Sequence, residues 1–252
     1  MSSNRLRNTP KIILCSKNRM LGIIITYHSF FEFISYQVAN LKKHIKVPFK
    51  IYLIDNSLTA GKKTQEDVQY IHCWEKGAPS HRHQTSINSG LAEAWVHCSH
   101  FLILDNDMVF LNDWTPPSCV AWVPQRRGQL NYAWLNLFYF PKMECFKYFE
   151  FANCKVTGER TDSGGSTGWY LNTVEKFEIQ TMPTTGNWFP RYEHAYRELC
   201  NKYSVGLWYD VFLLNNATIV FHFRALSNWT NYPEEFQKQK KELILEVCNE
   251  PL

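Results

Sequence analysis

The 252-residue sequence has no stretch that approaches the roughly 18 consecutive apolar residues of a membrane-spanning helix. It also has no long run of Lys or Arg, because its 27 basic residues are spread along the chain and leave a formal net charge of +4. The first absence argues against a transmembrane protein, and the second argues against binding to nucleic acid through a basic tract. The small positive charge is compatible with anionic ligands such as phosphates.

The cysteines form no CxxC pair and follow no regular spacing, so a disulfide framework is not expected. The first residues, MSSNRLRNTPK, contain no apolar segment of the kind that a secretory signal needs. We therefore expect a cytoplasmic protein with reduced, buried thiols, and we treat the sequons Asn216–Thr218 and Asn228–Thr230 as chance matches. The eight cysteines are Cys15, Cys73, Cys98, Cys119, Cys145, Cys154, Cys200 and Cys248.

The chain shows no internal repeat and no linker that would separate two domains. Its length and its 45% hydrophobic content suffice for one large α/β domain. We divide residues 1–252 into a first half of approximately 11–112, a second half of 113–230 and a C-terminal helix of 231–252. Aromatic residues make up 15% of the chain, which suits stacking on sugars or bases as well as ordinary packing.

In the first half, short apolar runs alternate with helical patterns. This alternation predicts a mostly parallel central sheet with helices on both faces, in which loops gather at the carboxyl ends of the strands. Asp55, the predicted loop His81–Asn88 and the Asp105/Asp107 pair should then meet in one crevice. Strands are expected at Leu21–Thr26 (with Lys11–Cys15 as an alternative first strand), Lys50–Ile54, Val68–Trp74 and Phe101–Leu111, and helices at Phe30–Ile45 and Leu91–His97.

In the second half the alternation breaks down, and we expect a smaller region beside the sheet. The polar, Gly-rich stretch Asn153–Gly168 is longer than a connector needs and predicts a binding loop, with a helix starting near Ser166. Strands are expected at Cys119–Val123, Tyr132–Phe140 and Thr218–Phe223, and the polar segment QRRGQLN separates the first two. Helices are expected at Pro141–Phe151, Glu193–Tyr203 and Pro233–Cys248. The last helix should carry a solvated Lys-rich face.

The segment Phe101–Leu111, FLILDNDMVFL, carries the strongest chemical signal. Its apolar residues predict a buried strand, and Asp105 and Asp107 fall at the carboxyl end, where open α/β sheets place their ligands. Two carboxylates next to a low-dielectric wall repel each other and lose solvation, which raises a pKa or requires a cation. An ordinary Asx-rich turn is the alternative explanation.

These features together resemble the GT-A fold of sugar-nucleotide-dependent glycosyltransferases, and family 2-like members in particular. The shared features are an acid that ends the second strand, an N-x-G helix, the D-x-D strand and a late His in an apolar strand. The resemblance covers roughly Ile23–Trp229 and is most specific over Ile87–Leu111. It implies transfer of a sugar from a nucleotide-diphosphate donor, with a UDP-sugar as the first expectation, to a hydroxyl group of a glycan or glycoconjugate.

The resemblance also assigns roles to individual residues. It implies that Asp105, Asp107 and His222 bind Mn²⁺ or Mg²⁺, although His222 could instead be a core residue. It places Asp55 and Asn56 at the base and ribose, Arg82 or Lys76 at the diphosphate, Asn88 at the helix start and Asn106 within the nucleotide site. Asp162 is the candidate general base, with Glu159 and Glu193 as alternatives, and Trp134, Asn136 and Trp169 are candidates for the sugar pocket.

Three other functions remain open at this point. A nucleotidyltransferase would share a related fold, but it would need a Gly-rich loop after the first strand, which neither SKNRM nor TYHSF supplies. A zinc-dependent binding module would need knuckle spacing, which is absent. A non-catalytic sugar-nucleotide binder is the third. The possible zinc ligands are His72, Cys73, His81, His83, His97, Cys98 and His100.

Overall fold

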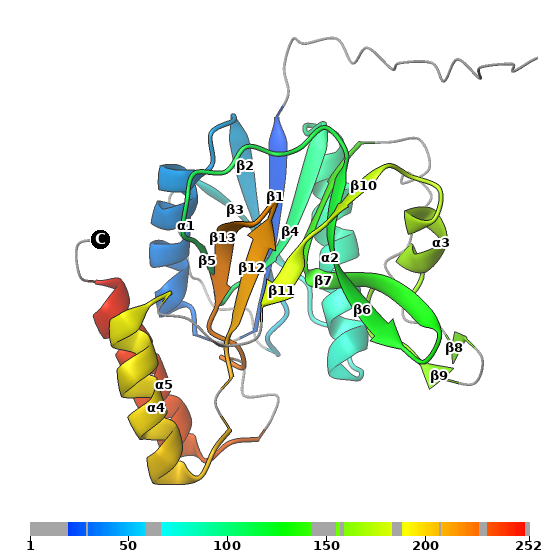
Figure 1. Cartoon of the computed structure of the whole chain (residues 1–252). Helices are drawn as coiled ribbons and strands as arrows, with labels where there is room; N and C mark the ends of the chain where they lie inside the picture. The colour runs from blue at the N-terminus through cyan, green and yellow to red at the C-terminus, as the bar shows by residue number, and fades with distance from the viewer. Residues whose placement is uncertain are drawn as a thin grey trace, which may run out of the picture.

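The computed structural model describes residues 20–28, 30–58, 67–142, 155–156, 159–182, 188–206, 208–226 and 231–249. These residues form an α/β structure in which a mixed, mostly parallel seven-stranded sheet carries helices on both faces (Figure 1). In spatial order, its strands are β10 (Lys176–Glu178), β6 (Val120–Arg127), β7 (Leu130–Pro141), β4 (His100–Asp105), β1 (Leu21–Tyr27), β2 (Phe49–Asp55) and β3 (Val68–His72).

A second sheet of four strands is formed mainly by the later part of the chain. Its order is β11 (Gln180–Met182), β12 (Asp210–Leu214), β13 (Ala217–His222) and β5 (Met108–Phe110), and all its pairs are antiparallel. The helices are α1 (Glu32–His44), α2 (Pro79–Trp95), α3 (Thr167–Leu171), α4 (Pro190–Tyr203) and α5 (Glu234–Cys248), and a small hairpin joins β8 (Lys155–Val156) to β9 (Glu159–Arg160).

The parallel part of the large sheet confirms the alternation seen in the sequence. β1 pairs with β2 and β4, and β3, which corresponds to the strand expected at Val68–Trp74, lies at the edge. The predicted helix at Phe30–Ile45 is α1, and the predicted strand at Leu21–Thr26 is β1. The alternative first strand, Lys11–Cys15, and the predicted helix over most of 141–151 lie outside the described residues.

The predicted loop at His81–Asn88 is wrong, because these residues belong to α2. The helix starts at Pro79, whose fixed φ suits a first helical position, and polar side chains hide the helical pattern of its first turns. Its buried positions still recur at helical spacing, from Ser86 and Ile87 to Gly90 and Ala94. A Cβ on Gly90 would come within 2.8 Å of side-chain carbons of β1 and β2, so glycine allows the helix to approach the sheet closely.

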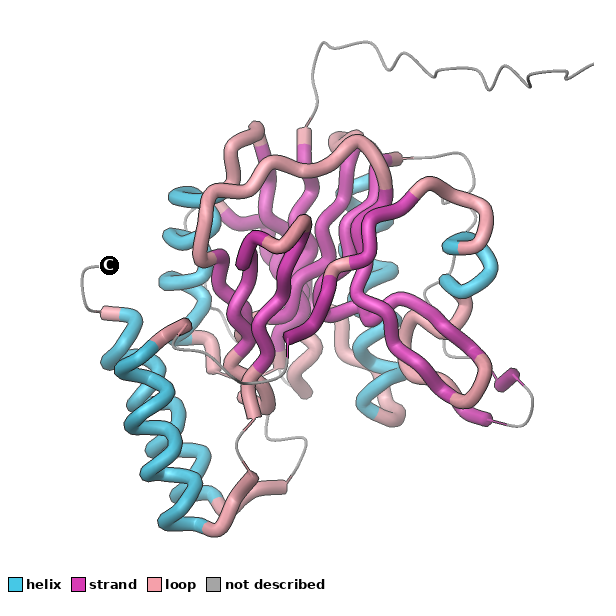
Figure 2. Tube along the Cα trace, viewed as in Figure 1, coloured by secondary structure: helices cyan, strands magenta, loops and turns pink. Residues whose placement is uncertain are grey.

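The polar segment QRRGQLN is also not a loop for most of its length. β6 continues to Arg127 and β7 starts at Leu130, so the pair forms one long hairpin that turns at Gly128, where φ is +55° (Figure 2). β7 pairs antiparallel with β4, which joins this hairpin to the parallel strands. The hairpin's polar residues are consistent with a strand pair that leaves the main body of the sheet.

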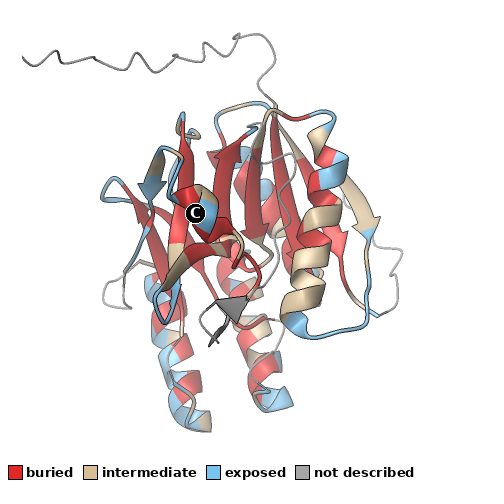
Figure 3. Cartoon of the chain, turned by 90° about the vertical axis from the view of Figure 1, so that its right-hand side faces the viewer, coloured by how far each residue is buried: buried red, intermediate tan, exposed pale blue. Residues whose placement is uncertain are grey.

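Most strands of the large sheet are buried (Figure 3), and different elements cover its two faces. Alternate β1 residues point to opposite faces: Ile23 and Ile25 pack with α1 and the second sheet, whereas Ile24 packs with α2. A third apolar cluster joins the second sheet to α4 and α5. The second sheet is therefore enclosed between the large sheet and this helix pair.

The predicted helices at Glu193–Tyr203 and Pro233–Cys248 are confirmed as parts of α4 and α5. The predicted solvated Lys-rich face of α5 is wrong at Lys240, which is fully buried. β12 was not predicted from the sequence. No helix in the described part of the chain combines the length and the apolar character needed to span a membrane.

Candidate metal centre

The D-x-D segment connects the two sheets. β4 ends at Asp105, and after a two-residue turn the chain enters β5, which belongs to the second sheet. In that sheet Met108 is paired with His222 of β13, and the backbone N–H of Phe223 donates to the carbonyl of Asp107 at 3.0 Å. The strand register therefore brings Asp107 and His222 together from distant parts of the sequence.

The three predicted metal-binding side chains lie in one cluster. Each of Asp105, Asp107 and His222 offers a ligand atom, and these atoms all lie within 4.8 Å of one another. His222 Nε2 lies 3.0 Å from Asp107 Oδ1, and both residues are buried. Asp105 is only partly buried, so the cluster is open on that side.

Asp210, which sequence analysis missed, completes the surroundings of the imidazole. It is paired with His222 in the β12–β13 register, and its Oδ2 lies 2.9 Å from His222 Nδ1. Arg224 donates from Nε to the same carboxylate oxygen. A carboxylate on one imidazole nitrogen fixes the ring orientation and leaves the other nitrogen for a metal ion, so Asp210 is placed as an outer partner of the centre.

A signal for this strand was present in the sequence. The apolar run DVFLL is followed by Asn-Asn and a second apolar run that ends in His222. Asn215 and Asn216 have φ values of +52° and +61°, as a tight hairpin turn of this kind requires. Recognition of this hairpin would have placed Asp210 opposite His222.

The charges in the cluster shift one another's protonation. Burial alone would raise the pKa of Asp107, but His222 outweighs that effect and holds the pKa below its usual value. Burial alone would lower the pKa of His222, but Asp107 and Asp210 raise it to about 9. The pKa of Asp210 is lowered despite burial, because His222 and Arg224 stabilise the carboxylate. Without a metal ion, His222 is therefore a cation between two carboxylates.

Asp105 is oriented by neighbours on several elements. Asn136 of β7 donates to its Oδ2, while Thr26 Oγ1 and His83 Nε2 each lie 3.5 Å from its Oδ1. The buried Gln37 side chain donates to the carbonyls of Asp105 and Met108 at 2.7 and 3.0 Å, which fixes the turn between β4 and β5. The turn Asp105–Asp107 is thus held in place by side chains from two helices and two strands.

A cleft of about 690 Å³ lies over the cluster. Its volume falls within the roughly 300–1,000 Å³ that small-molecule sites occupy. Its lining comes from both halves of the chain and combines acids, three arginines and one Trp. The lining includes Asn56, Arg82, His83, Asp105, Asn106, Asp107, Arg127, Trp134, Asn136, Asp162, Ser163, Asp210, His222 and Arg224.

The two residues predicted to bind the base and ribose have different environments. Asp55 is 1% exposed and is not part of the cleft lining. Its carboxylate already accepts hydrogen bonds from Tyr70 and from the backbone and side chain of Ser57. The adjacent Asn56 does line the cleft, and among the described residues its buried Oδ1 has no hydrogen-bond partner. Asn56 is therefore the residue of the two with an atom free for a ligand.

The remaining predicted site residues also divide into two groups. Arg82, Asn106 and Asp162 line the cleft, whereas Asn88 does not, and its expected place at a helix start is wrong because it lies within α2. Asp162 lies on a turn that is tightly fixed to β7: Gly164 has a φ of +91°, and a Cβ there would lie 2.6 Å from the Ala133 carbonyl. His83 Nδ1 lies 2.9 Å from Ser163 Oγ, which ties this turn to α2.

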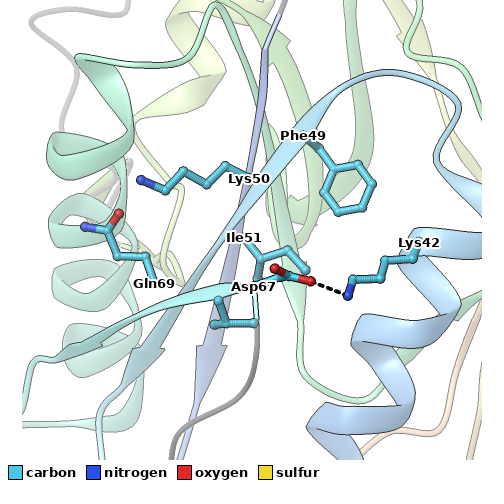
Figure 4. Close-up of a pocket in the computed structure, with 7 residues that line it drawn as sticks. Lys42, Phe49, Lys50, Ile51, Asp67 and Gln69 are labelled. Carbon is cyan, nitrogen blue, oxygen red and sulfur yellow. Dashed lines mark hydrogen bonds and ion pairs between the residues drawn. The ribbon is translucent and has the colours of Figure 1, made fainter.

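A second hollow lies at the other end of the sheet, near the starts of β2 and β3 (Figure 4). It is lined by Lys42, Asp67 and neighbouring residues, and the Lys42–Asp67 ion pair lies at its edge. Within the described residues, only the Asp105, Asp107 and His222 cluster has the proximity that a metal ion needs. The histidines and cysteines considered for a zinc module form no such group there.

We compared the chain with protein-family models and with curated proteins. No family model matches it, and no curated protein does.

Proposed function

We propose that this protein is a metal-dependent glycosyltransferase of the GT-A type, which transfers a sugar from a nucleoside-diphosphate donor to a hydroxyl group of a glycan or glycoconjugate. The observation that carries the proposal is the cluster of Asp105, Asp107 and His222 beneath a cleft of about 690 Å³. A UDP-sugar is the proposed donor. The topological support is that the cluster follows the carboxyl end of β4 in a mostly parallel sheet.

The ligand set fits the proposed metal. Two carboxylates and one imidazole, in an open site that leaves room for phosphate oxygens, suit Mn²⁺ or Mg²⁺. Such an ion would act as a Lewis acid on the departing diphosphate. Asp210 would hold His222 in the orientation that presents Nε2 to the ion.

Other residues of the cleft support binding of a nucleotide-sugar donor, which carries an anionic diphosphate and an aromatic base. Arg82 and Arg224 line the cleft and could make charge-assisted hydrogen bonds to phosphate oxygens. Asn56 offers an amide with an unused buried acceptor, which could pair with a polar edge of the nucleobase. These contacts would orient the donor so that its sugar faces the remaining part of the cleft.

Asp162 is the best-placed candidate for the general base. It lines the cleft on a fixed turn, so it could accept the proton of an acceptor hydroxyl if transfer inverts the configuration. Glu193 is less available, because its Oε1 accepts hydrogen bonds from the backbone N–H groups of Trp188 and Phe189 at the start of α4. The side chain of Glu159 lies outside the described part of the structure.

A thermal-shift screen of UDP-, GDP-, CDP- and dTDP-sugars, with and without Mn²⁺, tests the proposal. A ligand that binds only the folded state raises its melting temperature by mass action, so one donor class should give a shift that requires Mn²⁺. Asp107→Asn should abolish that shift, whereas Asp113→Asn, an exposed acid after β5, should keep it. Absence of any metal-dependent shift would contradict the proposal.

The reaction products separate this function from the nearest rival. A glycosyltransferase releases a nucleoside diphosphate, whereas a nucleotidyltransferase consumes a nucleoside triphosphate and releases inorganic pyrophosphate. Incubation of the donor identified above with a panel of glycan acceptors should therefore yield the diphosphate. Release of pyrophosphate from a triphosphate would instead favour the rival.

A further inference from the structure

The segment that follows His222 has an unusual backbone. Arg224 and Ala225 are consecutive non-glycine residues in the left-handed region, with φ values of +53° and +55°. This conformation is unfavourable for residues with a Cβ, and two in succession require support from the surrounding structure. The strained pair lies directly beside the metal cluster, because the residues that flank it, Phe223 and Leu226, each donate a backbone hydrogen bond to Asp107.

These two bonds connect the strained pair to the cluster. The backbone N–H of Phe223 donates to the Asp107 carbonyl at 3.0 Å, and the backbone N–H of Leu226 donates to the Asp107 carboxylate. The side chain of Arg224 holds Asp210, which in turn holds His222. A change in the backbone at 224–225 would therefore shift both a ligand residue and an outer partner of the metal centre.

Helix α5 supplies the support. The Nζ of Lys240 donates to the carbonyl of Arg224, and the Nε2 of Gln237 donates to the carbonyl of Ala225 at 2.9 Å. Lys240 and Gln237 are spaced to lie on one face of the helix, and both are buried. Each of the two strained residues is thus fixed through its carbonyl by one side chain of α5.

Burial of the Lys240 side chain is energetically unfavourable. Its exposed fraction is 0%, and a buried ammonium loses its hydration. Its surroundings compensate only in part: the ammonium lies 4.9 Å from the centre of the Tyr196 ring and attracts the Asp107 carboxylate. Other lysines of α5 are in exposed or half-exposed positions, so the helix does not require a lysine here for solubility.

We propose that α5 is a clamp for the metal centre, in which Lys240 and Gln237 act as positioning residues that hold the strained Arg224–Ala225 pair so that Asp107 and His222 keep the geometry for metal binding. The clamp serves the metal site on which the proposed function rests. It also acts in the metal-free protein, so it can be tested without any assumption about the reaction.

The test compares Lys240→Met and Gln237→Met with the wild-type protein and with Lys238→Met, a substitution at an exposed lysine of the same helix. Amide hydrogen exchange is measured at Phe223 and Leu226, and urea unfolding gives the global stability. The methionine variants keep the apolar bulk of the replaced side chains but donate no hydrogen bond. We expect exchange at these two amides to be at least about tenfold faster in both clamp variants, with exchange in the centre of β12 unchanged.

Binding of Mn²⁺ alone is measured in parallel, and its affinity should fall about tenfold in both variants, as for outer partners of other metal sites. Lys238→Met should change neither readout. Urea unfolding gives the loss of global stability in each variant, and faster exchange at Phe223 and Leu226 with unchanged exchange in the centre of β12 identifies a local rather than a general loss of order.

If the exchange rates of the Phe223 and Leu226 amides stay within twofold of wild type in both variants, the proposed clamp is contradicted. If the wild-type protein binds no Mn²⁺, the proposed function fails, and the clamp is then decided by the exchange rates alone.

Discussion

The parallel strands β1 to β4 and the second sheet differ in how far apart their partners lie along the chain. In the parallel part, β2 and β3 each pair with the strand that precedes them in the sequence, whereas β1 also pairs with the more distant β4. In the second sheet, β5 pairs with β13, which lies near the end of the chain. The first region supplies two acids, and the second supplies the imidazole and Asp210. The metal centre therefore depends on long-range pairing that no local pattern encodes.

Replacement of the imidazole should give the largest effect. His222→Gln removes the ligand that the second sheet contributes, and Asp105 and Asp107 remain. We expect Mn²⁺ affinity and metal-dependent turnover to fall about 100-fold or more, because loss of a direct ligand should cost at least as much as loss of an outer partner. Isothermal titration with Mn²⁺ measures the first and release of nucleoside diphosphate the second.

A change in His194, which is exposed on α4, serves as the control. His194→Gln should leave both quantities unchanged. If His222→Gln retained wild-type Mn²⁺ affinity, the second sheet would not contribute a ligand, and metal binding would not depend on the pairing of β5 with β13.

Asp210→Asn should have the next largest effect. The amide keeps the shape of the side chain but removes the charge that orients His222 and attracts its proton. We expect Mn²⁺ affinity to fall about 10- to 100-fold, the range typical of outer partners. Measurement of turnover at saturating Mn²⁺ should restore most of the activity, whereas a catalytic role for Asp210 would leave turnover low at any metal concentration.

The protonation of His222 predicts a dependence on pH. Its pKa in the folded, metal-free protein is raised from 6.5 to about 9, so the stabilisation from its charge is fully present below pH 6.5 and is lost as pH rises through about 9. A metal ion must displace this proton, and Asp107 and Asp210 stay ionised in this range because their pKa values are lowered. The apparent Mn²⁺ affinity should therefore rise about tenfold per pH unit between 6.5 and 9.

Titrations at several pH values in buffers of different ionisation enthalpy would measure both the affinity and the released proton. His222→Gln should remove the release of a proton in this range. Proton release that persists in this variant would have to come from another group.

The sequence predicted the strands β1 to β3, helix α1 and helices α4 and α5, because each has a period or a boundary that is local. The single strand expected over Phe101–Leu111 is wrong, because the chain turns after Asp105 and Met108–Phe110 join the second sheet as β5. The sequence did not predict α2 from Pro79, because polar side chains mask the few small buried ones such as Ser86. It also missed Asp210 and the buried position of Lys240. The hairpin signal at Asn215 and Asn216, which would have placed Asp210 opposite His222, was overlooked, whereas the burial of Lys240 depends on which carbonyl lies opposite and is not signalled by the residue type.

The smallest predicted effect concerns the unfolding free energy, and it follows from the different environments of Asp55 and Asn56. Tyr70→Phe removes the hydroxyl that donates to Asp55 Oδ2, at a position within the parallel part and away from the cleft lining. The loss of one hydrogen bond to a charged group should lower the unfolding free energy by about 1.5–3 kcal/mol. Donor binding should stay within twofold of wild type, because Asn56 rather than Asp55 lines the cleft.

Urea unfolding and a donor titration of the same preparation separate the two quantities. Asn56→Leu is the matched contrast, since it should weaken donor binding through loss of the cleft-lining amide. A large loss of donor affinity in Tyr70→Phe with unchanged stability would mean that Asp55 contributes directly to the nucleotide site. The acid that ends β2 would then serve the ligand as well as the fold, and the nucleotide site would extend further into the parallel half than the cleft lining indicates.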